Sequence, residues 1–252
     1  MFFNELELLE LRLMTLNEVV NYFVLVESNL SQTGNKKDFL FEKNQKLFKK
    51  YLDKIIYVKV EDTPVLDRSK DAWAIENFQR DCISRGLANA KDGDKVIISD
   101  LDEIPDPNKL MLVINSNDPV TFSQHLFYYF VNCLNARRIW NGPVITPFKN
   151  MDSPQVLRGR KLRYKKVKNG GWHYSYMGGL DRIKSKLNNL SDAFMRIDLV
   201  GDDADILRKI NSQKSLWDEN IAYRLIEIEK NGYAPSCIKK FIEKYPGFHF
   251  KV

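Results

Sequence analysis

Three carboxylates follow an apolar run in the middle of the chain. Asp100, Asp102 and Glu103 come directly after residues 96–99 (VIIS), a run that predicts a short buried strand. Carboxylates beside a buried strand are costly unless something pairs with them. In open α/β sheets, ligands bind beyond the carboxyl ends of the strands, so a divalent cation bound with a nucleotide would explain these acids. A solvated turn or a helix cap would explain them as well.

The residues before this run predict the beginning of an α/β fold. Residues 1–3 have the apolar character of a strand end, and the leucines at positions 6, 9, 13 and 16 have the spacing of an amphipathic helix. Residues 22–27 (YFVLVE) predict a second buried strand. A strand, helix, strand order favours a parallel sheet. Glu27, at the carboxyl end of the second strand, should therefore face the same edge as Asp100.

The rest of the chain shows neither an internal repeat nor an obvious linker, so we expect one domain over residues 1–252. Further strands are predicted at residues 54–60, 120–122, 144–146 and within 156–168. Further helices are predicted at residues 39–51, 72–90, 107–115, 181–187, 206–211 and 218–231. On the helix at 72–90, Trp73, Asn77 and Arg80 should share one side. This order of elements predicts the α/β class, with a mostly parallel central sheet flanked by helices.

Charge and cysteine content bear on the class of protein. The net charge of +6 is concentrated in residues 158–168, where we expect a solvated ribbon and keep a pyrophosphate or phosphorylated partner as the alternative. A basic chain can bind nucleic acid, but the acids around Asp100 make that the least favoured function. The three cysteines are far apart, which supports neither a disulfide framework nor a zinc site and favours a reducing compartment.

Residues 170–179 (GGWHYSYMGG) form an aromatic segment with two glycines at each end. The glycines permit close approach of the backbone to a ligand, or a tight turn. Four segments precede it in order: residues 4–13 (NELELLELRL), 23–28 (FVLVES), 72–87 (AWAIENFQRDCISRGL) and 99–105 (SDLDEIP). Together the five segments resemble glycosyltransferase family 17.

The resemblance implies a GT-A-type, Rossmann-like fold and an enzyme that depends on Mn²⁺ or Mg²⁺. It implies an inverting transfer of N-acetylglucosamine from UDP-N-acetylglucosamine to a hydroxyl of a glycan.

No run of about 18 apolar residues and no leader before Phe2 is visible, so we expect no membrane span, no signal peptide and a cytoplasmic location. The missing anchor favours a bacterial or viral relative. The alternative function is a non-catalytic carbohydrate-binding domain that keeps the fold.

The resemblance also suggests which residues hold the metal and the donor. Asp102 is expected to bind the cation, and His173 is its second protein ligand, because GT-A enzymes commonly supply one from a late segment. Packing of His173 among aromatic rings is the alternative. Asp100 would hold the ribose or a metal-bound water. Glu5 and Glu27 are expected at the uridine or ribose, although Glu5 also suits a helix start.

Three further roles complete the predicted site. Arg80 is expected to contact the base or a phosphate. An inverting transfer needs a general base for the acceptor hydroxyl, and Asp181 is the first choice, with Asp218 or Glu219 in reserve. Two tryptophans, Trp140 and Trp172, could stack on the apolar faces of acceptor sugars, but large aromatic side chains also suit a core.

Overall fold

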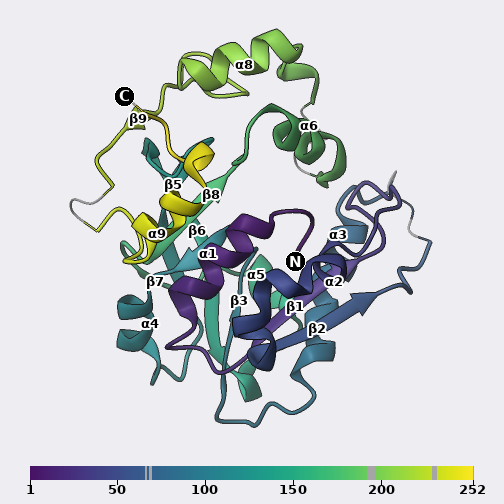
Figure 1. Ribbon diagram of the computed structural model, residues 1–252. Coiled ribbons are helices and arrows are strands. Elements are labelled where there is room, and N and C mark those ends of the chain that lie inside the picture. Colours follow the sequence, from purple (N-terminus) through teal and green to yellow (C-terminus); the bar gives the residue numbers. More distant parts are fainter. Residues whose placement is uncertain (66, 68–69, 192–196, 229–231, 252) are drawn as a thin grey trace.

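Two β-sheets with helices around them form the frame of the protein in the computed structural model (Figure 1). The structure describes residues 1–65, 67, 70–191, 197–228 and 232–251. Helices alternate with strands along the chain, and both parallel and antiparallel strand pairs occur. The expected α/β class is therefore confirmed.

The first sheet is the parallel pair of β1 (Phe23–Ser28) and β2 (Ile55–Val60). The helix α1 (Leu6–Leu16) precedes β1 and buries three of the four predicted leucines, Leu9, Leu13 and Leu16, together with Leu8 and Leu11. Before α1, Phe2 forms a parallel bridge to Glu27. The strand, helix, strand unit is therefore present at the start of the chain.

The second sheet has the strand order β3-β6-β5-β8-β4, with β7 beside β5 and β9 beside β6. Its strands are β3 (Lys95–Ile98), β4 (Glu103–Pro105), β5 (Val120–Tyr128), β6 (Cys133–Pro147), β7 (Lys165–Val167), β8 (Gly171–Ser175) and β9 (Arg224–Leu225).

Strand direction in this larger sheet differs from the expectation. β6 runs antiparallel to β3, β5 and β9, and β4 runs antiparallel to β8. Only β7 and β8 run parallel to their neighbour β5 within the described residues. The chain passes from β5 to β6 through residues 129–132, with Tyr129 at φ 66°, and so short a connection joins antiparallel strands. The expectation of a mostly parallel central sheet is therefore wrong.

Helices and 3₁₀ helices (η) connect and cover the strands (Figure 1). Besides α1 they are α2 (Leu40–Asn44), η1 (Gln45–Lys54), α3 (Ala74–Asp81), η2 (Cys82–Leu87), α4 (Pro107–Val113), η3 (Phe148–Asn150), α5 (Pro154–Gly159), α6 (Leu180–Asn189), η4 (Ile197–Leu199), α8 (Asp203–Asn211), α9 (Ile238–Lys244) and η5 (Pro246–Phe248). Among the residues that the structure describes, none of the helices is long and apolar enough to cross a membrane.

Two expected elements differ from the structure. Short strands were expected within residues 156–168, and β7 confirms one at Lys165–Val167. The first part of this range is instead the helix α5, because Ser153 caps it through the Val156 N–H and Pro154 suits its first turn. Residues 218–231 were expected to be helical, but β9 lies within them and pairs with β6. Positions 229–231 of that expected helix lie outside the described residues.

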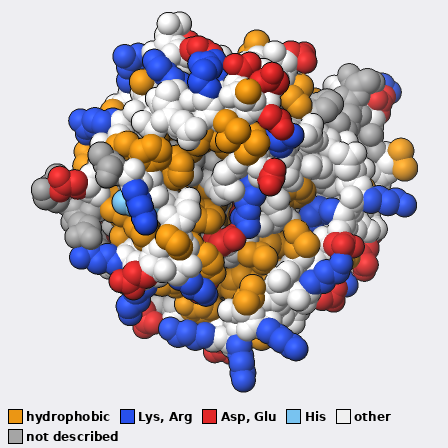
Figure 2. Space-filling view, turned by 45° about the horizontal axis from the view of Figure 1, so that its top comes forward, with side chains coloured by type: hydrophobic (Ala, Val, Ile, Leu, Met, Phe, Trp, Pro, Cys, Tyr) orange, Lys and Arg blue, Asp and Glu red, His pale blue; other side chains and the backbone are white. Residues whose placement is uncertain are grey.

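Basic side chains are spread around the surface seen in Figure 2, while hydrophobic side chains gather toward the middle of this face. The net charge of +6 is therefore not collected in one patch on this face. A nucleic-acid partner would favour a single basic stripe or patch. This face gives no support to that alternative.

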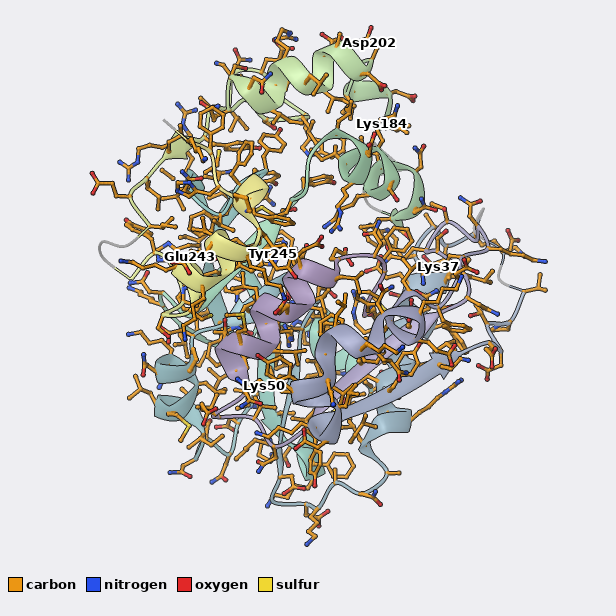
Figure 3. The ribbon with its side chains drawn as sticks, viewed as in Figure 1. Lys37, Lys50, Lys184, Asp202, Glu243 and Tyr245 are labelled. Atoms are coloured by element: carbon orange, nitrogen blue, oxygen red, sulfur yellow. The ribbon has the colours of Figure 1, made fainter. Side chains whose placement is uncertain are left out.

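α6 and α8 lie together at the top of Figure 1 and form a lobe with a core of its own. Ile183 and Leu187 of α6 pack with Ile206 and Ile210 of α8 in this core. At its edge, the Lys184 ammonium lies 2.7 Å from an Asp203 carboxylate oxygen. Figure 3 marks Lys184 on α6 and Asp202 at the start of α8.

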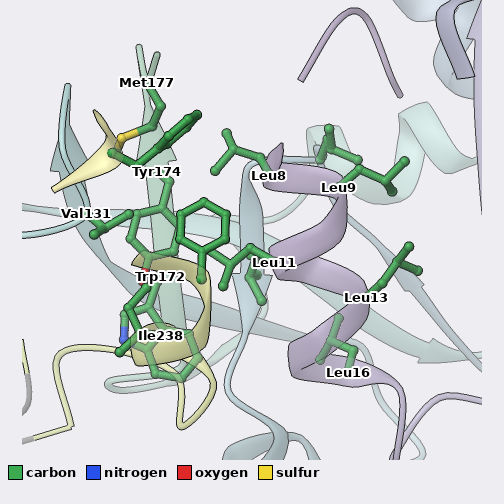
Figure 4. Packing of buried hydrophobic residues seen from close by; sticks show 14 of the residues in the cluster. Leu8, Leu9, Leu11, Leu13, Leu16, Val131, Trp172, Tyr174, Met177 and Ile238 are labelled. Carbon is green, nitrogen blue, oxygen red and sulfur yellow. The ribbon is translucent and has the colours of Figure 1, made fainter. Parts of the chain in front are cut away.

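The main core lies between α1, the larger sheet and α9. Leu8 and Leu11 of α1 lie toward Tyr174 of β8, and Ile238 of α9 belongs to the same cluster (Figure 4). Trp172 of β8 is 4% exposed and is part of this core. Because side chains alternate along a strand, the intervening His173 points to the opposite face of the sheet.

Candidate active site

A cleft of about 670 Å³ lies beside the carboxyl ends of β1 and β3. Ser28 at the end of β1 and Asp100 after β3 both line it, whereas Glu27, the residue expected to share this edge with Asp100, is not among the described residues of the lining. Trp73, Asn77 and Arg80 line it from the α3 region, so the predicted shared side of this helix faces the cleft. The cleft therefore gathers side chains from segments far apart in the sequence.

Arg12 of α1 fixes the turn between β3 and β4 by hydrogen bonds. The Arg12 guanidinium donates to the backbone oxygens of Asp100 and Glu103 at 3.2 and 2.8 Å, and to Ser99 Oγ at 2.6 Å. Asp102 is 7% exposed and Glu103 is fully buried. These acids are therefore not a solvated turn, and their charges need partners inside the protein.

Arg158 of α5 supplies the charge that Glu103 needs. Its guanidinium donates to Glu103 Oε1, to the Gly142 carbonyl oxygen and, at 2.9 Å, to Asp100 Oδ2. The Trp140 indole N–H also donates to Glu103. Arg158 is 5% exposed, so the start of the basic run at 158–168 is buried, which corrects the expectation of a solvated ribbon there.

Asp100 lies between two guanidinium groups. Its Oδ1 accepts a hydrogen bond from Arg80 at 3.1 Å, and its Oδ2 accepts the one from Arg158. Burial favours the protonated carboxyl, but Arg80 and Arg158 outweigh burial and hold the pKa of Asp100 well below its usual range. Arg80 also donates to Glu76 at 2.6 Å. Asp100 is therefore an ionised, fixed hydrogen-bond acceptor at the cleft.

One carboxylate oxygen of Asp102 contacts nitrogen atoms of two other side chains. His173 Nε2 lies 3.5 Å from Asp102 Oδ2, and Lys186 Nζ lies 2.8 Å from the same atom. The antiparallel register of Glu103 opposite His173, together with a hydrogen bond from the Tyr174 N–H to the Asp102 carbonyl oxygen, brings β8 to this position. The sequence analysis did not single out Lys186.

Asp102 and Lys186 each stabilise the charged form of the other. Burial favours protonation of Asp102, but Lys186 and His173 outweigh it and lower the pKa of the carboxyl. Burial likewise disfavours the ammonium, but Asp102 and then Glu5 outweigh it and raise the pKa of Lys186.

The His173 ring lies 4.7 Å from the Trp140 ring. Its Nδ1 is buried without a hydrogen-bond partner among the described residues.

The oxygen of Asp102 and the nitrogen of His173 suit a divalent cation that is also bound by the phosphates of a substrate. Within the described part of the chain there is no group of three or more His, Cys, Asp or Glu side chains that could hold a metal ion. Asp102 Oδ2 and His173 Nε2 are nonetheless close enough to touch one ion and both line the cleft. Magnesium commonly uses one or two carboxylates plus substrate phosphates, and manganese accepts imidazole. Two protein ligands therefore fit such an ion.

The family follows from comparison with known proteins. The model of glycosyltransferase family 17 matches residues 1–224. The chain belongs to this family. It is therefore a glycosyltransferase, as the sequence segments indicated.

Curated relatives of this glycosyltransferase include the human and rat proteins named beta-1,4-mannosyl-glycoprotein 4-beta-N-acetylglucosaminyltransferase, each 33% identical over 109 residues. The mouse protein of the same name is 32% identical over 109 residues. Each match covers 40% of this chain and 20% of the relative, so the chain spans about a fifth of their length. All three are mammalian and give no support to the expected bacterial or viral origin. No solved structure matches the chain.

Three other predicted donor-site residues of this glycosyltransferase have different surroundings. Arg80 and Glu5 line the cleft, and Glu5 Oε2 accepts hydrogen bonds from the N–H groups of Phe3 and Asn4 at 3.2 and 3.1 Å. Glu27 is fully buried and is not among the described residues that line the cleft. It accepts hydrogen bonds from Lys37, Tyr57 and the first N–H groups of α2, so it stabilises that helix start.

The two tryptophans predicted at the acceptor lie on opposite sides of the sheet. Trp140 lines the cleft, and the Lys161 ammonium lies 4.7 Å from its ring. Trp172 belongs to the main core and is not among the described residues that line the cleft. Of the two predicted tryptophans, Trp140 is the one that lines the cleft.

The three predicted general bases are outside the described lining of the cleft. Asp181 is exposed in the first turn of α6. Asp218 accepts hydrogen bonds from Asn220, and Glu219 is exposed and paired with Arg208 at 2.6 Å. Their assignment as the base stays a prediction, and these positions count against it.

Proposed function

We propose that this glycosyltransferase moves N-acetylglucosamine from a UDP-sugar onto a hydroxyl of a glycan, with inversion at the anomeric carbon and with Mn²⁺ or Mg²⁺ as cofactor. The observation that carries the proposal is the meeting of Asp102 and His173, 3.5 Å apart at the wall of the cleft. The printed name of the mammalian relatives supports N-acetylglucosamine as the sugar. We also propose residues 1–252 as one GT-A-type domain, which begins with the parallel β1–β2 pair.

The nucleoside side of the proposed donor site lies between α3 and the turn after β3. The carboxylate of Asp100 is partly exposed to the cleft, at 32% of its side chain, and both of its oxygens are held by arginines. A fixed, ionised acceptor suits a ribose hydroxyl, because a charged acceptor forms a strong hydrogen bond with a hydroxyl donor. Arg80 lies beside it, where a base or phosphate contact is within its reach.

The diphosphate side is proposed at Asp102 and His173, which would hold the cation together with diphosphate oxygens. When bound there, the cation would neutralise the negative charge that develops on the departing UDP. Asp102 is suited to the role because its charge persists in a buried site, where Lys186 and His173 outweigh the cost of burial and lower its pKa. His173 offers Nε2 to the cleft, and its orientation is fixed by the β4–β8 register.

The acceptor is proposed to bind along the wall made by Trp140. The faces of a sugar ring are partly apolar and stack on an indole. The Trp140 ring is oriented by its own N–H, which donates to the buried Glu103. Lys161, which also lines the cleft, offers hydrogen bonds next to this ring.

Turnover of UDP-N-acetylglucosamine tests this proposal. The purified protein should release UDP from this donor when Mn²⁺ is present, and faster when a glycan acceptor is added. Asp102→Asn should reduce the rate at least about a hundredfold while the far-ultraviolet circular dichroism stays unchanged. Absence of turnover with every UDP-sugar, together with glycan binding that needs neither metal nor nucleotide, would establish the non-catalytic alternative instead.

A further inference from the structure

Lys186 is bound to the carboxylate that the proposed cation would use. Its Nζ lies 2.8 Å from Asp102 Oδ2, closer than His173 Nε2 at 3.5 Å from the same oxygen. The three side chains are mostly buried, with 18%, 11% and 10% of Lys186, Asp102 and His173 exposed. An ammonium ion therefore neutralises Asp102.

Three other basic side chains that line the cleft pair with different acids. Lys37 pairs with Glu27, and Arg80 and Arg158 pair with Asp100. Those pairs leave Asp102 untouched. A cation that approaches Asp102 thus competes with Lys186, whose ammonium is paired directly with that carboxylate.

The fold delivers Lys186 and His173 from one continuous segment. β8 carries His173, the chain turns at Gly178 and Gly179, with φ of 93° and 82°, and α6 then carries Lys186. The Lys186 ammonium also lies 5.2 Å from the centre of the Tyr176 ring, a favourable cation–π distance. Lys186 lines the cleft, so its ammonium can contact a ligand that binds there.

We propose that Lys186 makes binding of the divalent cation depend on the nucleotide diphosphate, an inference that rests on the proposed function. Without a ligand, the ammonium occupies Asp102 and repels a second positive charge. A diphosphate that enters the cleft offers its oxygens to the ammonium and to the cation, and Asp102 becomes free for the cation. Lys186 is then a diphosphate-binding residue, and cation and diphosphate bind as a unit.

Binding of Mn²⁺ measured with and without UDP tests this inference. Isothermal titration of the full chain should show that UDP tightens Mn²⁺ binding by about tenfold or more. In Lys186→Met, which removes the charge and keeps much of the side-chain length, Mn²⁺ alone should bind about tenfold more tightly than to the wild type. In this variant UDP should tighten the binding of Mn²⁺ by less than about threefold.

Lys184→Met is the matched control, because Lys184 lies on the same helix and pairs with Asp203 away from Asp102. It should bind Mn²⁺ and UDP as the wild type does. Lys186→Gln replaces Lys186→Met where circular dichroism shows that the methionine variant does not fold. The wild type alone also tests the inference, since equal Mn²⁺ affinity with and without UDP would overturn it.

The outcomes separate this inference from the proposed function. Wild-type coupling that persists unchanged in Lys186→Met and Lys186→Gln, with unchanged affinity for Mn²⁺ alone, would make Lys186 a structural residue and leave the proposed function standing. A wild-type protein that binds no Mn²⁺ even in the presence of UDP would overturn both.

Discussion

Arg158 Nη2 lies 2.9 Å from Asp100 Oδ2 and at the same time bonds to the fully buried Glu103. One guanidinium group, 55 residues later in the chain than Glu103, thus joins two of the three acids after β3, Asp100 and Glu103, to α5. The position of Asp102 between these two acids depends on this link. The arginine therefore connects this turn to α5 at the wall of the cleft.

Arg158→Met should destabilise the fold by about 3–5 kcal/mol, because it leaves the Glu103 carboxylate buried without its cation. Chemical denaturation followed by circular dichroism measures this. Arg160→Met is the matched control, since Arg160 is exposed and pairs with Asp152 on the surface, where such pairs contribute about 0–1 kcal/mol. Equal effects of the two substitutions would mean that Glu103 does not depend on Arg158.

Asp100 should make stability fall at acid pH. Burial favours the protonated carboxyl, but Arg80 and Arg158 outweigh burial, so the pKa is lower in the folded state than in the unfolded chain. Ionised Asp100 therefore stabilises the fold above its unfolded pKa of about 3.9, and this stabilisation is lost as the pH falls below it.

Melting temperatures between pH 7 and pH 3 test this dependence. Asp100→Asn should lower the melting temperature at pH 7 and show a smaller further decrease toward pH 3 than the wild type. Parallel curves for the two proteins would show that Asp100 is not held as an ion in the fold.

Trp140→Leu should weaken the acceptor more than the donor. The substitution removes the indole face in the cleft, so KM for a glycan acceptor should rise by about five- to tenfold, in keeping with the energy of one aromatic contact. KM for UDP-N-acetylglucosamine should change by less than about twofold. Steady-state kinetics with each substrate varied in turn measure both, and a rise confined to the donor KM would place the indole at the nucleotide.

Gly171→Ala should disturb the pairing that places His173. Gly171 has φ 130°, and a Cβ there would overlap the Ile104 carbonyl oxygen on the neighbouring strand. We expect a loss of about 2–4 kcal/mol and a proportionate loss of Mn²⁺-dependent UDP binding. Gly93→Ala is the control, because nothing lies within 4 Å of a Cβ at that position. Equal stability of the two variants would contradict the tight approach of β4 and β8.

Local periodicity was enough to predict the beginning of the fold. The leucine spacing of α1 and the apolar runs of β1 and β2 reflect which face of each element is buried, and burial is visible in the sequence. Strand direction in the larger sheet depends on contacts between distant segments, and the β5–β6 hairpin carries no short glycine turn that would reveal it. A parallel sheet was therefore expected where an antiparallel one forms.

The site was partly predictable for a similar reason. Asp102 stands out because it is an acid after a buried strand, and His173 because it lies among glycines and aromatic residues. Lys186 is 84 residues from Asp102 in the chain, and its own surroundings look like an ordinary solvated helix face. Arg158 lies in a run of basic residues that hides its burial. Neither partner carries a local signal, so only the folded structure reveals them.

Thermal stabilisation by UDP-N-acetylglucosamine is the most direct test of the claim that Asp102 and His173 bind a cation together with the donor's diphosphate. The melting temperature of the wild type should rise when both Mn²⁺ and this donor are present, and much less with either alone, because a ligand that binds only the folded state stabilises it. Asp102→Asn and His173→Ala should each abolish the joint rise. A rise of the same size without Mn²⁺, or one that persists in both variants, would contradict the account.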